Sequence, residues 1–153
     1  MHMHHNHYTR LLVMAAVSFV AMYVLMYAMV DTVADVYNNL NQVYMAGLMA
    51  SPMIVIELML MTGMYQNKRL NAGLILASSV AGLICFVMIR QQTAISDRQF
   101  LRSMIPHHSS AILMCEEGAI EAAKIRDLCA RIVASQQAEI AEMRALVRQE
   151  ILK

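Results

Sequence analysis

The sequence contains no tryptophan, only two prolines and three cysteines, and very few charged residues in its first half. An odd number of cysteines without a Cys-x-x-Cys spacing gives neither a zinc-ribbon motif nor a disulfide framework. The Lys and Arg residues of the C-terminal part are interleaved with Glu and Asp, so no basic patch predicts a nucleic-acid partner. No glutamate has a histidine three residues later, and no nucleophile elbow or phosphate loop is present. We therefore expect a protein that is not an enzyme and does not bind nucleic acid.

Long uncharged stretches occupy most of the first half of the chain. Residues 11–89 contain only five charged side chains, and 59% of the whole chain is hydrophobic, with a mean hydropathy of +0.49. About 20 apolar residues in a helix cross the roughly 30 Å hydrocarbon core of a bilayer. Three stretches meet this requirement: 11–30, 43–65 and 72–89. We therefore predict a protein of the lipid bilayer with a three-helix transmembrane domain over 10–91; the alternative for the first stretch is a cleaved signal peptide.

The charges beside these stretches indicate an orientation. Arg10 precedes the first span, and Lys68 and Arg69 lie between the second and third, whereas the loop 31–42 is acidic and has no Lys or Arg. Positive charge is enriched on the cytoplasmic side of a membrane. We therefore expect a cytoplasmic N-terminus in a cytoplasmic (inner) membrane and a periplasmic or otherwise extracytoplasmic C-terminal part. The arginines after the third span oppose this orientation: Arg90, Arg98 and Arg102.

The C-terminal part changes from continuous apolar sequence to amphipathic sequence. Apolar residues recur at spacings of three and four after Ser96, and Asp97 and Gln99 follow that serine as in a helix N-terminus. The pattern loses phase at 122–125, which predicts an antiparallel helical hairpin over 96–153; one long helix from Ser96 is the alternative. A two-helix hairpin buries too little apolar surface to be stable alone. We therefore predict a homo-oligomer in which two hairpins complete a four-helix bundle.

Small residues in the third span suggest a further contact between copies. Ser78 and Gly82 are four residues apart, as are Ala77 and Ala81. Such spacing lets membrane helices approach closely, although it is common and weakly specific.

Sulfur and imidazole groups gather on the inward stripe of the hairpin. Met104 and His108 are four residues apart on this stripe, and a reversal near residue 122 brings Met143 within a turn of Met104. Thioether and neutral imidazole suit Cu(I) or Ag(I), and a thioether needs no deprotonation. We therefore predict a soft-metal site drawn from five residues: Met104, His107, His108, Met114 and Met143. The alternative is a core histidine bonded to Gln136 among methionines that only fill space.

The same reversal places Cys115 opposite Cys129. The two cysteines are candidates for an accessory metal site or for a disulfide, and buried inert thiols are the more frequent case. Gln136 lies opposite His108 in this register, where it would orient the imidazole behind the metal.

The run from Phe100 to Leu146 resembles the family called domain of unknown function 305. Its pattern appears here as Phe100, Met104, His107 and His108; then Ala111, Ile112 and Met114; then Gln136 or Gln137, Glu139, Ile140 and Met143. The resemblance implies a ferritin-like helical bundle, often extracytoplasmic, with copper bound by Met and His in some members. The resemblance adds Gln137 and Glu139 to Gln136 as residues that would orient the metal ligands by hydrogen bonds without binding the metal themselves. The membrane half resembles the three-span anchor of one subgroup.

Two further features agree with metal binding. The tail of residues 1–9 is rich in His and Met, and four of its histidines are candidate accessory ligands: His2, His4, His5 and His7. One face of the second span carries a stripe of methionines with a single acid: Met45, Met49, Met53, Glu57 and Met61. An acid within the bilayer marks an ion path or a polar contact between helices, and the contact is the more common case.

We therefore expect a membrane-anchored binder of Cu(I) or Ag(I) that sequesters the metal or hands it to metal-handling partner proteins. One alternative is an accessory scaffold without a metal site. The other is a metal-conducting transporter subunit that uses the methionine stripe and Glu57.

Overall fold

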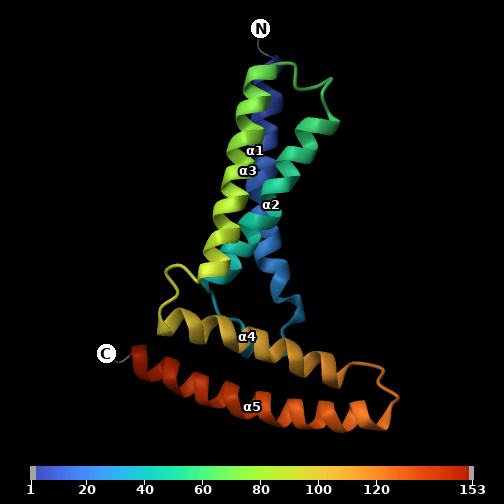
Figure 1. Ribbon diagram of the computed structural model, residues 1–153, viewed down its shortest axis with the longest axis vertical. Coiled ribbons are helices and arrows are strands. Elements are labelled where there is room, and N and C mark those ends of the chain that lie inside the picture. The colour runs from blue at the N-terminus through green and yellow to red at the C-terminus, as the bar shows by residue number, and fades with distance from the viewer. Residues whose placement is uncertain (1–2, 152–153) are drawn as a thin grey trace. The chain divides into compact units, whose positions relative to one another are not determined.

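The computed structural model describes residues 3–151, with side chains described for 7–149; the regular elements of these residues are all helices, and no strand is present among them. The elements in chain order are α1 (Met3–Leu25), the 3-10 helices η1 (Met26–Met29) and η2 (Val33–Asp35), α2 (Leu40–Leu60), α3 (Lys68–Gln91), α4 (Asp97–Glu116) and α5 (Ala123–Ile151) (Figure 1). The prediction of an all-α protein is confirmed. The chain divides into two compact units, which are described separately below.

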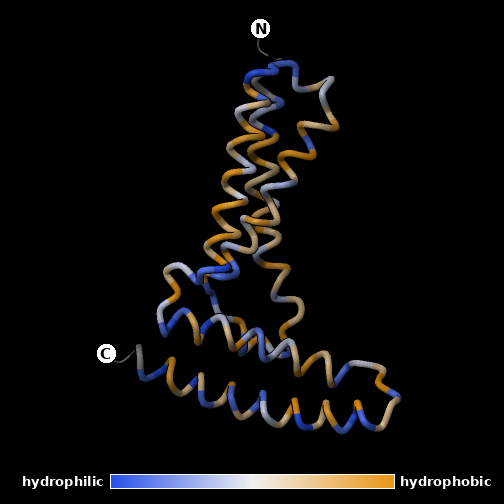
Figure 2. Tube along the Cα trace, in the orientation of Figure 1, coloured by the Kyte–Doolittle hydropathy of each residue, from blue (hydrophilic) through white to orange (hydrophobic). Residues whose placement is uncertain are grey.

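Three helical segments among the described residues are long and apolar enough to cross a membrane: His7–Met29, Leu40–Leu60 and Lys68–Gln91. Their mean hydropathies are 2.2, 1.8 and 2.4. Figure 2 shows the contrast with α4 and α5, along which hydrophilic and hydrophobic residues alternate. The number of candidate spans agrees with the sequence. The second span is shorter at its end than expected, because α2 stops at Leu60 and a turn follows around Thr62 and Gly63.

The first unit contains the chain up to Leu25 and residues 41–93. Its helices α2 and α3 approach each other through small residues. The hydroxyl of Ser78 donates to the carbonyl oxygen of Ser51 at 3.3 Å, and a Cβ at Gly82 would lie 3.0 Å from the Ser51 Cβ. The Ser78 and Gly82 pair therefore serves packing within one chain rather than between third spans of two copies, which corrects that expectation. Ala77 and Ala81 remain exposed.

The second unit contains residues 26–40 and the chain from Ala94 onward. Helices α4 and α5 form an antiparallel hairpin that reverses at 117–122, so the single long helix is wrong (Figure 1). Its core consists of six buried side chains: Leu101, Ile105, Ile112, Ile140, Met143 and Val147. Ser96 occupies the N-cap position of α4, but its hydroxyl makes no cap hydrogen bond; its carbonyl oxygen instead accepts from the Phe100 N–H at 2.8 Å.

The segment 26–40 belongs to this hairpin unit, whereas the sequence-based division assigned it to the membrane domain. Tyr37 packs against the hairpin core, and Asp35 is buried. Left-handed backbone at Gln92 and Ala94, with φ of 50° and 58°, separates α3 from α4. The hairpin unit therefore has a third element besides its two helices.

Candidate metal-binding site of the hairpin

His108 lies on the inward face of α4 and is 8% exposed. Its Nδ1 is 2.9 Å from the carbonyl oxygen of Met104, one turn earlier in the same helix. Its Nε2 is 2.8 Å from a carboxylate oxygen of Glu139 on α5. Because a backbone carbonyl only accepts, Nδ1 carries a hydrogen and donates it.

Glu139 is held as a carboxylate. The Ser135 hydroxyl donates to its other oxygen at 2.8 Å, and this bond, followed by the bond from His108, lowers the pKa of Glu139 below its usual 4.5. The hydrogen bond between this carboxylate and Nε2 of His108 links the two arms of the hairpin.

The partner of His108 is Glu139, one of the residues that the family resemblance named, and not Gln136, which the register placed opposite the ring. Gln136 is half-buried, and Glu139, three residues later and nearly one turn further along the same face of α5, bonds to the ring. A carboxylate forms a stronger, charge-assisted hydrogen bond with a ring N–H than a neutral amide does, which explains why it takes this place. Gln137 is exposed and lines a different cavity, beside Arg144.

The two thioethers of the expected ligand trio lie in one cluster. Met143 is buried at 9% exposure within the hairpin core, and Met104 packs against this core from the opposite arm. His107 and Met114 lie elsewhere: both are exposed, and the His107 ring centroid is 6.1 Å from that of His108. The structure therefore places Met104 and Met143 at the hairpin core and buries His108, and it leaves His107 and Met114 exposed.

No three or more His, Cys, Asp or Glu side chains in the described part of the chain are placed to hold a metal ion together. Within the hairpin, His108 already has a partner at each nitrogen. A metal bound here would therefore depend on thioether sulfur and on release of Nε2 by Glu139.

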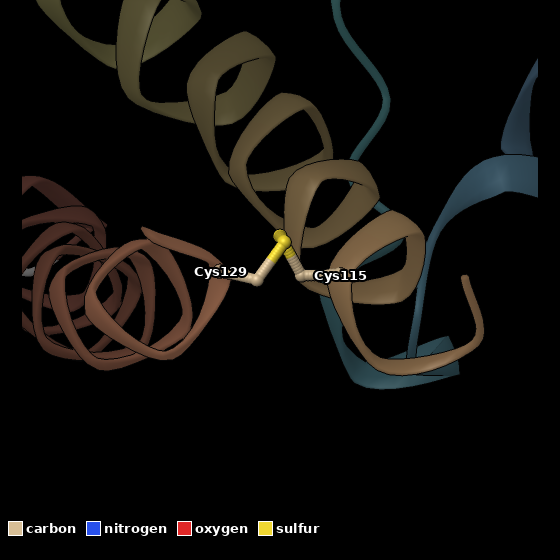
Figure 3. The surroundings of a disulfide bond; sticks show 2 residues. All are labelled: Cys115 and Cys129. Atoms are coloured by element: carbon tan, nitrogen blue, oxygen red, sulfur yellow. A yellow bond between two sulfur atoms is a disulfide. The ribbon is translucent and has the colours of Figure 1, made fainter. Parts of the chain in front are cut away.

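Cys115 and Cys129 form a disulfide between α4 and α5, with their Cα atoms 5.2 Å apart (Figure 3). The sequence left open a metal site or a disulfide for these two cysteines, and this structure contains the disulfide. Both sulfurs are consumed in that bond, so they are no metal ligands while it is intact. Cys85, in α3, is a free thiol.

A buried polar cluster ties the segment 26–40 to the hairpin, and sequence reasoning missed it. Asp35 accepts hydrogen bonds from the hydroxyls of Thr32 and Ser109, both at 3.0 Å, and forms an ion pair with Arg144. The Asp31 N–H donates to the Ser109 hydroxyl at 3.0 Å. The only signal in the sequence was a pair of acids in a short loop; their partners lie too far along the chain to be found by spacing.

The methionine stripe of the second span does not line the inside of one chain. Met45 and Met49 are exposed on α2, Met53 is half-buried, and Met61 follows the end of the helix.

Glu57 has a tyrosine partner. The Tyr65 hydroxyl donates to its carboxylate at 3.3 Å. Burial, and then the charge of Glu57, raise the pKa of Tyr65, which keeps the phenol protonated as a donor. Glu57 thus makes a polar contact with a tyrosine, but this tyrosine lies in the connection after α2 and not on another helix.

Of the histidine tail, His2 lies outside the described residues, as do the side chains of His4 and His5. His7 is half-buried at the start of the first span.

Comparison with known proteins extends the resemblance beyond the hairpin. The family described as Domain of unknown function (DUF305) matches residues 49–147, from within α2 to near the end of α5. An uncharacterized protein of Acanthamoeba polyphaga mimivirus is 34% identical over 146 residues, which cover 94% of each chain. No solved structure matches. The chain belongs to the DUF305 family.

Proposed function

We propose that this protein is a membrane-anchored binder of soft metal ions, Cu(I) or Ag(I), that holds them or passes them to a partner protein. The observation that carries the proposal is the packing of Met104 and Met143, from opposite arms of the hairpin, in one cluster on the side where His108 lies. Thioether and imidazole are donors that select monovalent copper and silver over hard cations. Cu(I) or Ag(I) is the cargo of such a site.

The hydrogen bonds of His108 support a specific route for binding. Nδ1–H donates to the Met104 carbonyl, which leaves Nε2 as the ring nitrogen that can bind metal. Glu139 must first release Nε2. The Glu139 side chain is 50% exposed, so it can turn toward water. The thioethers need no deprotonation before they bind metal.

The disulfide supports an extracytoplasmic hairpin in a cytoplasmic membrane. Disulfides persist in oxidising compartments and are rare in the cytosol. An extracytoplasmic hairpin also agrees with the positive charges of Lys68 and Arg69 in the opposite loop. In intact cells, a protease added outside should cleave the exposed turn at 117–122. Protection of this turn, with cleavage only after the membrane is opened, would reverse the orientation.

We further propose that two hairpins pack together. The core of one hairpin has only six buried apolar side chains, and α5 exposes three large apolar ones: Ile125, Leu128 and Leu146. Leu128→Lys should dissociate the oligomer, whereas Ala134→Lys, at another exposed position of α5, should not. Light scattering of the detergent-corrected mass measures the difference. A monomeric wild-type protein would refute the association.

The bonds of His108 also favour the scaffold alternative, because a histidine with partners at both nitrogens needs no metal. The outward position of Met45 and Met49 does not favour the transporter. A transporter would need several copies to enclose a path. It would carry Cu(I) into vesicles and lose that transport in Glu57→Gln.

Titration of the oxidised full chain in detergent with Cu(I), against a chromophoric chelator, tests the proposal. Met104→Leu and Met143→Leu keep the core volume and remove only the sulfur, so they separate ligation from packing. Each should weaken binding at least about tenfold, the scale on which even the outer partners of metal ligands act.

Met114→Leu is the matched control, because Met114 is 56% exposed on the same helix as Met104. It should leave the affinity unchanged. The scaffold is the better description if wild type and Met104→Leu compete equally poorly with the chelator. His107→Ala and His108→Ala compare adjacent imidazoles outside and inside the hairpin, and only the second should lose binding.

A further inference from the structure

The end of the hairpin at the turn contains a cavity beside the disulfide. It has a volume of about 540 Å³ and is lined by both cysteines, by Ile120 of the turn and by Val133 of α5. One charge of each sign also lines it, from Glu116 and Arg126. Cys115 and Cys129 are themselves only half-buried. A small thiol can therefore enter the cavity and reach the sulfurs.

We propose that Cys115 and Cys129 form a second soft-metal site, closed in the oxidised protein and opened by a dithiol reductant. Cys115 is seven residues beyond His108 in α4, about 10 Å further along the helix at 1.5 Å per residue. The cysteine site shares no residue with Met104, His108 and Met143. The two sites can therefore be tested independently of each other.

The redox step balances as thiol–disulfide exchange. A thiolate of the reductant attacks one cysteine sulfur, the Cys115–Cys129 bond breaks, and a mixed disulfide forms. The second thiol of the reductant displaces the bound cysteine and closes the reductant's own disulfide. Two electrons and two protons thus pass to the protein, which gains two thiols. One Cu(I) then binds both sulfurs as thiolates and releases two protons.

The hairpin keeps the two sulfurs together after reduction. The Cα atoms are 5.2 Å apart, and core residues on both arms hold the helices in place. Metal–thiolate bonds of about 2.3 Å, the value for zinc, need the sulfurs to separate to at most about 4.6 Å. Rotation of the side chains supplies this separation with the backbone unchanged. Thiolates are also the donors that soft monovalent ions prefer.

Cu(I) titration of the full chain in detergent, before and after reduction, tests the site. The reduced form is prepared with dithiothreitol and freed of it without oxygen. We expect reduced protein to bind one more Cu(I) per chain than oxidised protein, with an ultraviolet thiolate-to-copper band. Cys115→Ser and Cys129→Ser should bind the same amount under both conditions.

Cys85→Ser is the matched control, because Cys85 is the free thiol of α3, and it should keep the gain on reduction. Alkylation of reduced Cys85→Ser blocks only the hairpin thiols and should abolish the gain without a change of fold. Equal binding by reduced and oxidised wild type would overturn the second site. Binding by the oxidised protein reports separately on Met104, His108 and Met143, so the two proposals fail independently.

Discussion

Asp35 and Arg144 are 109 residues apart in sequence and form an ion pair with an oxygen to nitrogen distance of 2.5 Å. Asp35 is 4% exposed and also accepts from the hydroxyls of Thr32 and Ser109. The pair joins the segment after the first candidate span to the helix that follows the third. The proposed three-span arrangement likewise places these two segments on one side of the membrane.

Removal of the Asp35 carboxylate should destabilise the hairpin unit. In Asp35→Asn the guanidinium of Arg144 loses its counter-ion, and loss of one partner of a fully buried pair costs about 3–5 kcal/mol. We expect about 2–3 kcal/mol, because the Arg144 side chain is 31% exposed. Thermal unfolding in detergent, followed by circular dichroism, measures this loss.

Asp127→Asn is the control for that experiment. Asp127 and Arg131 form an ion pair of 3.6 Å on the surface of α5, with side chains 74% and 71% exposed. Such exposed pairs contribute about 0.3–0.5 kcal/mol. Equal effects of the two substitutions would mean that the buried cluster does not hold the segment 26–40 in place.

Acid should weaken the link between the arms of the hairpin through Glu139. A group whose pKa is lowered on folding stabilises the folded state above its unfolded value, which is about 4.5 here, and this contribution is lost as the pH falls through the folded value. The temperature at which half of the wild-type protein is unfolded should therefore decrease as the pH is lowered below about 4.5. The Glu139→Gln variant should lack this part of the pH dependence, and in acid its stability should approach that of the wild type.

Ser135→Ala offers a second measurement of the same effect, because the Ser135 hydroxyl is the largest cause of the lowered pKa. The acid transition should move to higher pH in this variant. A transition unchanged in both variants would show that another carboxylate is responsible.

The contact between α2 and α3 should not tolerate a larger residue at Gly82. A Cβ there would lie 3.0 Å from the Ser51 Cβ, so Gly82→Val must push the helices apart. Overpacking of this kind costs about 1–3 kcal/mol. Gly73→Val, in the same helix, is the control, because its Cβ meets nothing within 4 Å. On heating in detergent, only the Gly82→Val variant should unfold at a lower temperature than the wild type.

The helices could be predicted because long apolar runs and spacings of three and four are local properties of the sequence. The pairing of Cys115 with Cys129 follows from the position of the reversal, although the sequence left metal binding and a disulfide both open. The register placed Gln136 opposite His108, whereas the residue that bonds to the ring is Glu139, which the family resemblance had also named. The two residues lie nearly one turn apart on one face of α5, so register alone does not choose between them. The stronger hydrogen bond of a carboxylate decides in favour of Glu139.

The segment 26–40 could not be predicted, because it is short, has no apolar period and is held by polar contacts. Ser109 had no distinguishing pattern in the sequence, yet it is fully buried and bonds to both Asp31 and Asp35. Contacts between positions so far apart depend on the fold as a whole.

The bond between Cys115 and Cys129 makes the peptide connection at 117–122 redundant as a link between the two arms. A chain cut there stays in one piece, and its fragments separate on a denaturing gel only after reduction. New termini, or an inserted sequence, can therefore be accommodated at this turn while the arms remain joined through sulfur.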